Sequence, residues 1–318
     1  MNSAAPLVSV ALCTYNGERY LAQQLESLLA QHQPLELVAC DDASDDATWE
    51  VLQQHAPRFA RARLLRNPRT LGVHANFQQA LAACRAEWIA PCDQDDIWAP
   101  QKLTRLLAQA GDAALVYCDS ELIDAEGRPL GERVSGRLPM ISGSRPLAFA
   151  LGNCVSGHAA LFRRSLLAQA LPVPAGVYYD EWLAFVASSL GTIRYVDEAL
   201  VQFRQHQGNL TRFVGQGDAG RKSPLALHRV QAPKLDALAG FPGPAQARLQ
   251  KLSRLWRARE HQWLSPCLAV LMLRDHSELM RLAPRVQRRS AWRQALKLFW
   301  GLRAKMLTWQ ARQGRPAR

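Results

Sequence analysis

Apolar and polar positions follow two alternating periods along the first 120 residues. Short apolar runs, typical of buried strands, cover residues 7–13, 35–40, 63–66, 88–92 and 114–119. Between them, apolar residues recur at helical spacing over residues 18–31, 47–55, 73–84 and 100–109. Strands that alternate with helices through short loops predict right-handed βαβ units. The pattern therefore predicts an α/β fold, with a Rossmann-like, mostly parallel sheet and helices on both faces.

The second half of the chain is less regular. Residues 120–150 are rich in Gly, Ser, Pro and Arg, and we expect an irregular connection there. Further strands are predicted at 159–162, 192–196 and 200–203, and a helix from Tyr178 to about residue 190. A single long helix is predicted from Ala291 to Trp309. We predict an α/β domain over residues 1–212, a linker over 213–224 and a basic helical extension over 225–318.

Polar clusters follow three of the predicted strands directly. They are Tyr15-Asn16-Gly17, Asp41-Asp42 and Asp93-Gln94-Asp95-Asp96. In sheets of this type, ligands bind beyond the carboxyl ends of the strands. The three clusters should therefore meet at one edge of the sheet and form a binding site.

The third cluster places three carboxylates within four positions. Like charges this close repel unless a cation neutralises them. Asp93 and Asp95 would share one side of an extended chain, because side chains alternate with period two. Hard oxygen ligands suit Mg²⁺ or Mn²⁺, which can also hold a substrate's phosphates. The alternative is an acidic turn that caps the next helix, and Asp96, on the opposite side, is expected to be structural or capping.

Several site classes lack their sequence signals. No Gly-x-Gly-x-x-Gly follows the first strand, and no Gly-x-x-x-x-Gly-Lys-Ser/Thr occurs. A bound nucleotide would thus have its phosphates held by a metal and carboxylates. The seven cysteines include no Cys-x-x-Cys pair. They are predicted to be buried free thiols, without a disulfide framework or a zinc site.

Charge is distributed unevenly. Residues 219–318 carry 21 Lys and Arg against 4 Asp and Glu, whereas residues 1–218 carry 18 against 23. Within 291–309, basic residues fall between apolar ones at helical spacing, which is typical of a helix on an anionic membrane surface. The apolar positions are Trp292, Ala295, Leu296, Phe299, Leu302, Met306 and Trp309. A helix packed on the body, with a solvated basic face, is the alternative.

Other partners and compartments are less favoured. The acidic edge and the lack of a recognisable binding module disfavour nucleic acid. The first residues lack the basic start of a signal peptide, and no stretch reaches the roughly 18 to 20 apolar residues that span a bilayer. We expect a cytoplasmic protein, peripheral on the inner face of the cell membrane.

Five motifs in this order resemble the inverting glycosyltransferase family 2, which has the GT-A fold, and within it bacterial rhamnosyltransferase-type enzymes. The resemblance covers residues 7 to about 212 and not the tail beyond 220. The motifs are Val8-Ser9-Val10-Ala11-Leu12-Cys13-Thr14-Tyr15-Asn16-Gly17, Cys40-Asp41-Asp42-Ala43-Ser44-Asp45-Asp46-Ala47-Thr48, Asp93-Gln94-Asp95-Asp96-Ile97-Trp98, Tyr179-Asp180-Glu181-Trp182-Leu183-Ala184 and Phe203-Arg204-Gln205-His206-Gln207-Gly208-Asn209.

The resemblance implies a role for each motif. Asp42, with Asp41 as an additional candidate, would accept a hydrogen bond from a pyrimidine imide. Asp180 would be the general base, with Glu181 as the alternative. The role of His158 stays open, and Asp45 and Asp46 are expected to be caps. The implied nucleotide-binding residues are Thr14, Tyr15, Asn16, Asp41, Asp42 and Asp93, and the implied metal-site residues are Asp95, Asp93 and His206.

The implied function is an inverting glycosyltransferase that depends on Mg²⁺ or Mn²⁺. It would move a sugar from a UDP- or dTDP-sugar to a saccharide or lipid-linked saccharide during cell-surface polysaccharide synthesis. The position of Asp180 at a helix start should favour its ionised form. The alternative is an inactive GT-A-like binding or scaffold protein, recruited to the membrane by its basic tail.

Overall fold

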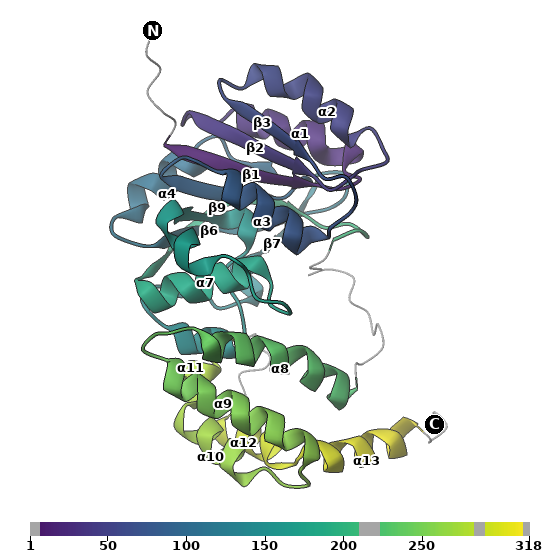
Figure 1. Cartoon of the computed structure of the whole chain (residues 1–318), viewed down its shortest axis with the longest axis vertical. Helices are drawn as coiled ribbons and strands as arrows, with labels where there is room; N and C mark the ends of the chain where they lie inside the picture. The colour runs from purple at the N-terminus through teal and green to yellow at the C-terminus, as the bar shows by residue number, and fades with distance from the viewer. Residues whose placement is uncertain (1–6, 210–222, 283–289, 314–318) are drawn as a thin grey trace. The chain divides into compact units, whose positions relative to one another are not determined.

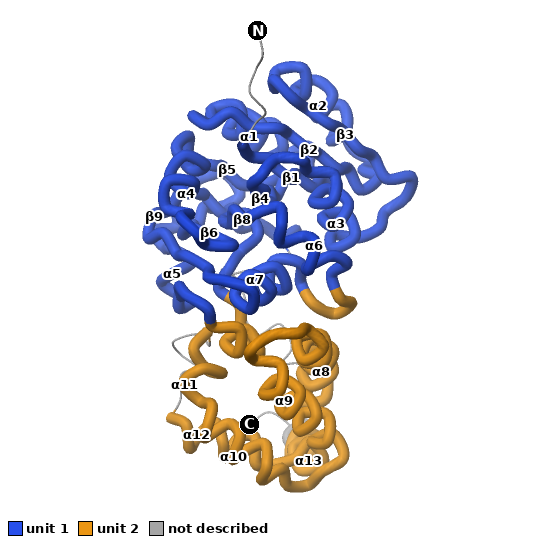
Figure 2. Tube along the Cα trace, turned by 60° about the vertical axis from the view of Figure 1, so that its left-hand side comes forward, with its two compact units in different colours: residues 1–144, 154–173, 178–214 blue, residues 145–153, 174–177, 215–318 orange. Residues whose placement is uncertain are grey.

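The computed structural model describes residues 7–209, 223–282 and 290–313. The chain divides into two compact units (Figure 2). Unit 1 contains residues 1–144, 154–173 and 178–214, and unit 2 contains 145–153, 174–177 and 215–318. Two short segments inside the predicted α/β domain, 145–153 and 174–177, thus belong to the helical unit.

Unit 1 is built on one nine-stranded sheet (Figure 1). Its order is β3-β2-β1-β4-β8-β6-β9-β5, and β7 pairs with β6. The strands are β1 Val8–Thr14, β2 Leu35–Asp41, β3 Ala62–Arg66, β4 Trp88–Cys92, β5 Ile97–Trp98, β6 Leu115–Ile123, β7 Pro129–Arg133, β8 Ala160–Arg163 and β9 Ile193–Arg204. The pairs among β3, β2, β1 and β4 are parallel, as predicted.

The second half of the sheet corrects the prediction of a mostly parallel sheet. Strand β8 runs antiparallel to both of its neighbours, β4 and β6. Strands β5 and β7 are also antiparallel to their partners, while β6 and β9 are parallel. The α/β class is confirmed, with a mixed sheet instead of a mostly parallel one.

Helices cover both faces of the sheet in unit 1 (Figure 1). On one face, α1 and α4 pack with Val8, Val10 and Leu12 of β1 in a single apolar cluster. On the other face, α3 contacts β1 and β2. This arrangement buries every residue of the central strand β1. The helices are α1 Glu18–Leu29, α2 Thr48–His55, α3 Val73–Ala83, α4 Lys102–Ala110, α5 Val134–Arg137, α6 Leu167–Ala170 and α7 Tyr179–Leu190.

Two segments are more regular than the sequence predicts. Residues 120–150 do not form an irregular connection throughout, because β6 continues to Ile123 and β7 returns beside it. Asp124 stabilises the turn between them by accepting hydrogen bonds from the N–H groups of Glu126 and Arg128. The two strands predicted at 192–196 and 200–203 are one strand, β9, whose pairing with β6 shifts register around Asp119.

Unit 2 is helical and has a core of its own. Helix α8 contacts α9, and α10 contacts α12. Leu235, Leu249, Leu268 and Met272 are buried there. The helices are α8 Pro224–Gly240, α9 Gln246–Ala258, α10 Pro266–Arg274, α11 His276–Leu279, α12 Ala291–Phe299 and α13 Leu302–Gln313. Among the residues that the structure describes, no helix is both long enough and apolar enough to span a membrane.

The prediction of a single helix from 291 to 309 is wrong. Helix α12 ends at Phe299 and α13 begins at Leu302. Between them, Trp300 forms a β-bridge with Leu264, and the N–H of Gly301 donates to the Trp263 carbonyl. The backbone of this break is thus bonded to another segment, which a helical period alone does not reveal.

Gly301→Ala should destabilise unit 2. A Cβ at position 301 would lie 1.9 Å from the backbone oxygen of Gln262, so the two segments would have to separate. We expect a loss of about 1–3 kcal/mol in the free energy of unfolding, typical of overpacking. Chemical denaturation measures it. Gly240→Ala is the matched control, because a Cβ there meets nothing within 4 Å; equal losses in both variants would contradict the prediction.

Candidate functional site

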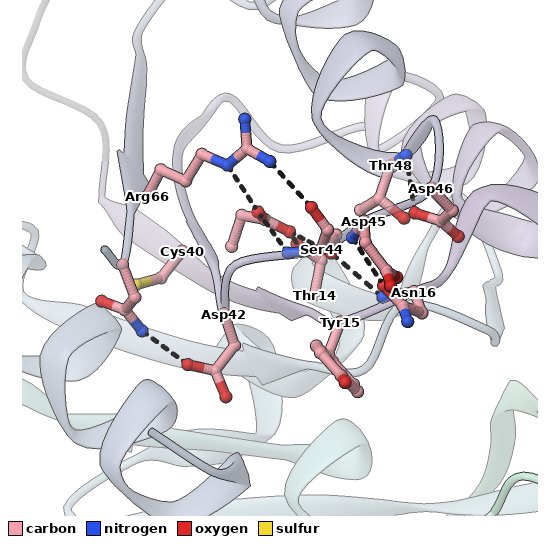
Figure 3. Close-up of polar contacts among 12 residues, drawn as sticks. Thr14, Tyr15, Asn16, Cys40, Asp42, Ser44, Asp45, Asp46, Thr48 and Arg66 are labelled. Carbon is pink, nitrogen blue, oxygen red and sulfur yellow. Dashed lines mark hydrogen bonds and ion pairs between the residues drawn. The ribbon is translucent and has the colours of Figure 1, made fainter. Parts of the chain in front are cut away.

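The ends of β1 and β2 form the first part of the site, where Figure 3 shows Thr14, Ser44 and Arg66 close together. The carboxylate of Asp41 contacts all three of these side chains. It accepts hydrogen bonds from the Thr14 hydroxyl at 2.9 Å and from the Ser44 hydroxyl at 2.5 Å. Arg66 pairs with the same carboxylate at 3.2 Å. Asp41 is fully buried. Both Asp41 and Thr14, which were predicted to bind nucleotide, therefore have structural partners within the protein.

Asp42 lies beside it and is also nearly buried, with 2% of its surface exposed. Its carboxylate accepts hydrogen bonds from the side chain of Asn67 and from the backbone N–H groups of Leu71 and Gly72, each at 2.8 Å. Only one of the three donors is bonded to Oδ2. Because each carboxylate oxygen can accept about two hydrogen bonds, Oδ2 keeps acceptor capacity for a ligand.

The loop after β1 carries Tyr15 and Asn16. The backbone N–H of Asn16 donates to Ser44 Oγ, and Asn16 Oδ1 accepts from the N–H of Asp45 (Figure 3). Asn16 has a φ of 46° and Ala43 a φ of 60°, which are unfavourable for side chains with a Cβ. Asp46 Oδ1 accepts from the N–H of Thr48, the first residue of α2, while the N-cap position itself is Ala47. The side chain of Tyr15, 49% exposed, is left facing solvent.

Gln94 was not singled out from the sequence, although it lies inside the acidic motif. Its side-chain amide forms two hydrogen bonds with the backbone of Tyr15: Oε1 accepts from the N–H at 2.8 Å, and Nε2 donates to the carbonyl at 2.9 Å. A Cβ on Gly17 would lie 2.2 Å from Gln94 Oε1. Gln94 therefore links the Tyr15 loop to the carboxylates, and Gly17 leaves room for this contact.

The acidic motif itself does not continue the strand. Strand β4 ends at Cys92, and residues 93–96 bend before β5. The expected period-two placement of Asp93 beside Asp95 therefore fails, and Asp93 lies with Asp96 and His158 instead. His158 Nδ1 is 3.5 Å from Asp93 Oδ2 and 3.4 Å from Asp96 Oδ2. Asp96 caps no helix: its Oδ1 accepts from the N–H of Arg204.

His158 lies beneath the acidic loop and is buried. Its Nε2 is 3.0 Å from Ser120 Oγ, and its carbonyl accepts from the Lys102 ammonium, which also lies over the Trp98 ring. Burial lowers its pKa, but the carboxylates of Asp96 and Asp93 raise the pKa above the ordinary value overall. Burial also raises the pKa of Asp96, to about 8. Both pKa shifts favour the protonated form of the group.

Asp95 pairs with the other histidine. His206 Nε2 lies 2.7 Å from Asp95 Oδ2. His206 Nδ1 accepts a hydrogen bond from the N–H of Gly208, so the ring proton is on Nε2 and points at the carboxylate. In this arrangement His206 orients Asp95, and its Nε2 could ligate a metal only in the other tautomer, with the ring proton on Nδ1.

Arg204 supports the acidic loop from inside the protein. Only 1% of it is exposed. Its Nε donates to the Asp95 carbonyl at 2.8 Å, and Nη2 donates to Gln23 Oε1 at 2.7 Å. The guanidinium also lies 4.7 Å from the centroid of the Tyr20 ring. Because these donors are directed by packed elements, the carboxylates of the loop are held in place before any ligand binds.

Asp180 lies in the first turn of α7 and is partly buried. Its Oδ1 accepts from the N–H of Glu181. Burial, with smaller contributions from the charges of Glu181 and Asp93, raises the pKa of Asp180 to about 7, although the N–H of Glu181 and the charge of His158 lower it. Burial thus shifts the pKa in the direction opposite to that expected from the position at the helix start. The influence of Asp93 and His158 shows that all three groups lie within electrostatic reach.

The residues of this edge fit a divalent cation. The ligand atoms of Asp93, Asp96 and His158 all lie within 4.8 Å of one another. Asp96 Oδ2 is buried without a hydrogen-bond partner. The exposed fraction of the side chain is 37% for Asp93, 14% for Asp95 and zero for Asp96. Carboxylate oxygens suit Mg²⁺ or Mn²⁺, and the accessible carboxylates at this edge are those of Asp93 and Asp95.

Known proteins resemble this chain in sequence. The profile "Glycosyl transferase family 2" matches residues 9–170, slightly more than half of the chain. An uncharacterized protein of Mycobacterium tuberculosis is 29% identical over 63% of this chain and 59% of its own. An uncharacterized glycosyltransferase of Nostoc is 29% identical over 64% and 66%. Chondroitin synthase of Escherichia coli is 32% identical over 38% and 18%. The chain thus spans about three fifths of the length of the first of these curated relatives.

A solved structure resembles it in fold. Staphylococcus aureus TarS, residues 1–349, in complex with UDP-GlcNAc, superposes with a TM-score of 0.58 at 17% identity, covering 92% of this chain and 80% of that one. The likeness shows a shared GT-A fold. The profile match over residues 9–170, which covers the motifs after β1, β2 and β4, establishes that the chain belongs to glycosyl transferase family 2.

Proposed function

We propose that the protein transfers a sugar from a nucleoside diphosphate sugar to an acceptor hydroxyl with inversion at the anomeric carbon. The observation that carries the proposal is the position of Asp180. Its carboxylate, with a pKa of about 7, lies within electrostatic reach of Asp93 at the acidic edge. A general base is most efficient when its pKa is near the working pH. A large fraction of the base is then deprotonated, and the deprotonated form still accepts a proton strongly.

The donor we propose is a UDP- or dTDP-sugar. The exposed ring of Tyr15 can stack on a base, and Asp42 Oδ2 can accept the imide N–H of a pyrimidine. The structure of TarS with UDP-GlcNAc is consistent with a uridine donor. Asn16 and Thr14 would act by holding the Tyr15 loop, and Gln94 by fixing it against the carboxylates.

Asp93 and Asp95 would hold a Mg²⁺ or Mn²⁺ ion, because their carboxylates are the accessible ones at the acidic edge. When bound, the ion supplies Lewis-acid stabilisation of the diphosphate leaving group. Asp96 and His158 lie beneath and hold Asp93, while His206 and Arg204 hold Asp95. Asp180 takes the proton of the acceptor hydroxyl as it attacks from the face opposite the leaving group.

The acceptor we propose is a saccharide or a lipid-linked saccharide in cell-surface polysaccharide synthesis. Support comes from the family and from relatives such as chondroitin synthase. Rhamnosyl transfer, suggested by the sequence motifs, is the proposed subtype.

Calorimetry with UDP and with dTDP, each with and without Mn²⁺, tests the donor site. We expect binding that Mn²⁺ strengthens, and about tenfold weaker binding by Tyr15→Ala, since stacking on one base contributes about 1–3 kcal/mol. Folding should not change, because the Tyr15 side chain is half exposed. Tyr178→Ala, 58% exposed, is the matched control and should bind UDP normally. A parent chain that binds neither nucleotide would be a scaffold instead of a transferase.

A further inference from the structure

One side of helix α12 is apolar and exposed. Ala295 and Leu298 are buried in unit 2, whereas Trp292 is 75% exposed and Leu296 is 61% exposed. Residues four apart lie on the same face of a helix, so Trp292 and Leu296 are neighbours. Packing inside unit 2 explains why apolar residues recur on the buried side of α12. It does not explain the large apolar residues on the exposed side.

The exposed side continues past the end of the helix. Trp300 is 49% exposed and forms an antiparallel bridge with Leu264, which is 45% exposed. Residues that oppose each other in an antiparallel pair point to the same side. Trp292, Leu296, Trp300 and Leu264 therefore form one apolar surface, called here the tryptophan face. Single exposed apolar residues are common on protein surfaces, but a contiguous group of large ones marks an interaction site.

Both charged residues of α12 are basic. Arg293 and Lys297, both exposed, lie next to Trp292 and Leu296 on α12. No acidic residue follows Glu278 in the sequence, whereas 11 Lys and Arg do. A partner of the tryptophan face must therefore accept apolar side chains and supply negative charge beside them.

An anionic bilayer meets both requirements. Its interface accepts tryptophan and leucine side chains, and its headgroup phosphates pair with Arg and Lys. A second copy of this chain would bring two strongly positive surfaces together, which repel. We propose that the tryptophan face inserts into the interface of an anionic membrane, with Arg293 and Lys297 against the headgroups.

Co-sedimentation of the full chain with vesicles tests this. One set contains phosphatidylglycerol in phosphatidylcholine, and the other contains phosphatidylcholine alone. We expect binding to the first set and much weaker binding to the second. Trp292→Ala/Leu296→Ala should lower the partition coefficient by about tenfold or more, because two large apolar side chains leave the interface. Arg293→Gln/Lys297→Gln should lower it by about tenfold or more at low salt.

The matched control is Leu227→Ala/Val230→Ala in α8, which removes two apolar side chains that are 57% and 62% exposed and lie outside the tryptophan face. It should bind the anionic vesicles like the parent. Unfolding curves and UDP binding should stay unchanged in all variants, which separates this proposal from the proposed function. Equal binding to both vesicle sets, no binding to either, or normal binding by Trp292→Ala/Leu296→Ala would overturn it. The proposal would also be overturned if the parent chain formed a dimer that Trp292→Ala/Leu296→Ala dissociates.

Discussion

The Asp180→Asn variant should transfer sugar with a kcat about 10²- to 10⁴-fold below that of the parent chain, the range that a positioned general base contributes. Asparagine keeps the size of the side chain and can still accept from the N–H of Glu181, but it cannot take a proton. Donor binding should persist, because the nucleotide contacts that we propose lie at the ends of β1 and β2. Steady-state transfer and UDP calorimetry measure the two effects separately.

The pH profile of the parent chain gives a second readout of the same residue. Because burial raises the pKa of Asp180 to about 7, the carboxylate becomes protonated as the pH falls through that value. The rate of sugar transfer should therefore decrease as the pH falls below about 7. The residual activity of Asp180→Asn should not show this decrease. Glu181→Gln is the control: Glu181 is buried, with 7% of its surface exposed, and its replacement should retain the decrease. A normal kcat in Asp180→Asn would show that another group is the base.

The Asp95→Asn variant should bind Mn²⁺ at least about 100-fold more weakly than the parent, since losing even an outer-shell partner costs a metal site about 10- to 100-fold. The loss of one negative charge from an accessible carboxylate is the physical reason. Titration of Mn²⁺ by electron paramagnetic resonance, with UDP present, measures the affinity. Asp95→Asn should also lose sugar transfer. Removing the metal from the parent chain with a chelator should cause the same loss.

Two further variants identify the ligand set. His206→Gln should weaken Mn²⁺ binding by only about tenfold, because it loosens the orientation of Asp95 without removing an oxygen ligand. Asp96→Asn should have a similarly modest effect through Asp93. If Asp96→Asn and His158→Gln abolished Mn²⁺ binding while Asp95→Asn did not, the ion would be held by the Asp93, Asp96 and His158 cluster instead.

Local patterns predicted the first half of the fold well, because each pattern there has one physical meaning. Seven-residue apolar runs such as β1 are buried on both faces of a sheet, and this requires parallel strands with helical crossovers. The polar clusters after β1, β2 and β4 were correctly placed at strand ends for the same reason. The prediction failed where pairing is non-local: β8 reverses direction between β4 and β6, and no residue near it signals this.

The C-terminal tail shows the same limit of prediction from local patterns, in this case for a helix. The apolar period from 291 to 309 predicted one helix with one apolar stripe. The backbone of Gly301 instead bonds to Trp263, and the stripe divides between a buried side and the tryptophan face. A helical period identifies apolar positions, but only the neighbouring segment decides which of them are covered.

The sequence by itself determined the α/β class, the acidic edge and the family, since these depend on local periodicity and on motifs that act within a few residues. The tertiary structure alone showed how the three aspartates divide their contacts. Asp93 and Asp96 lie at His158, and Asp95 lies at His206, because the chain bends after Cys92. His158 comes 62 positions after Asp96, and His206 comes 111 positions after Asp95, so neither contact is local in the sequence. It also raised the pKa of Asp180, since burial depends on elements that meet only in the folded chain.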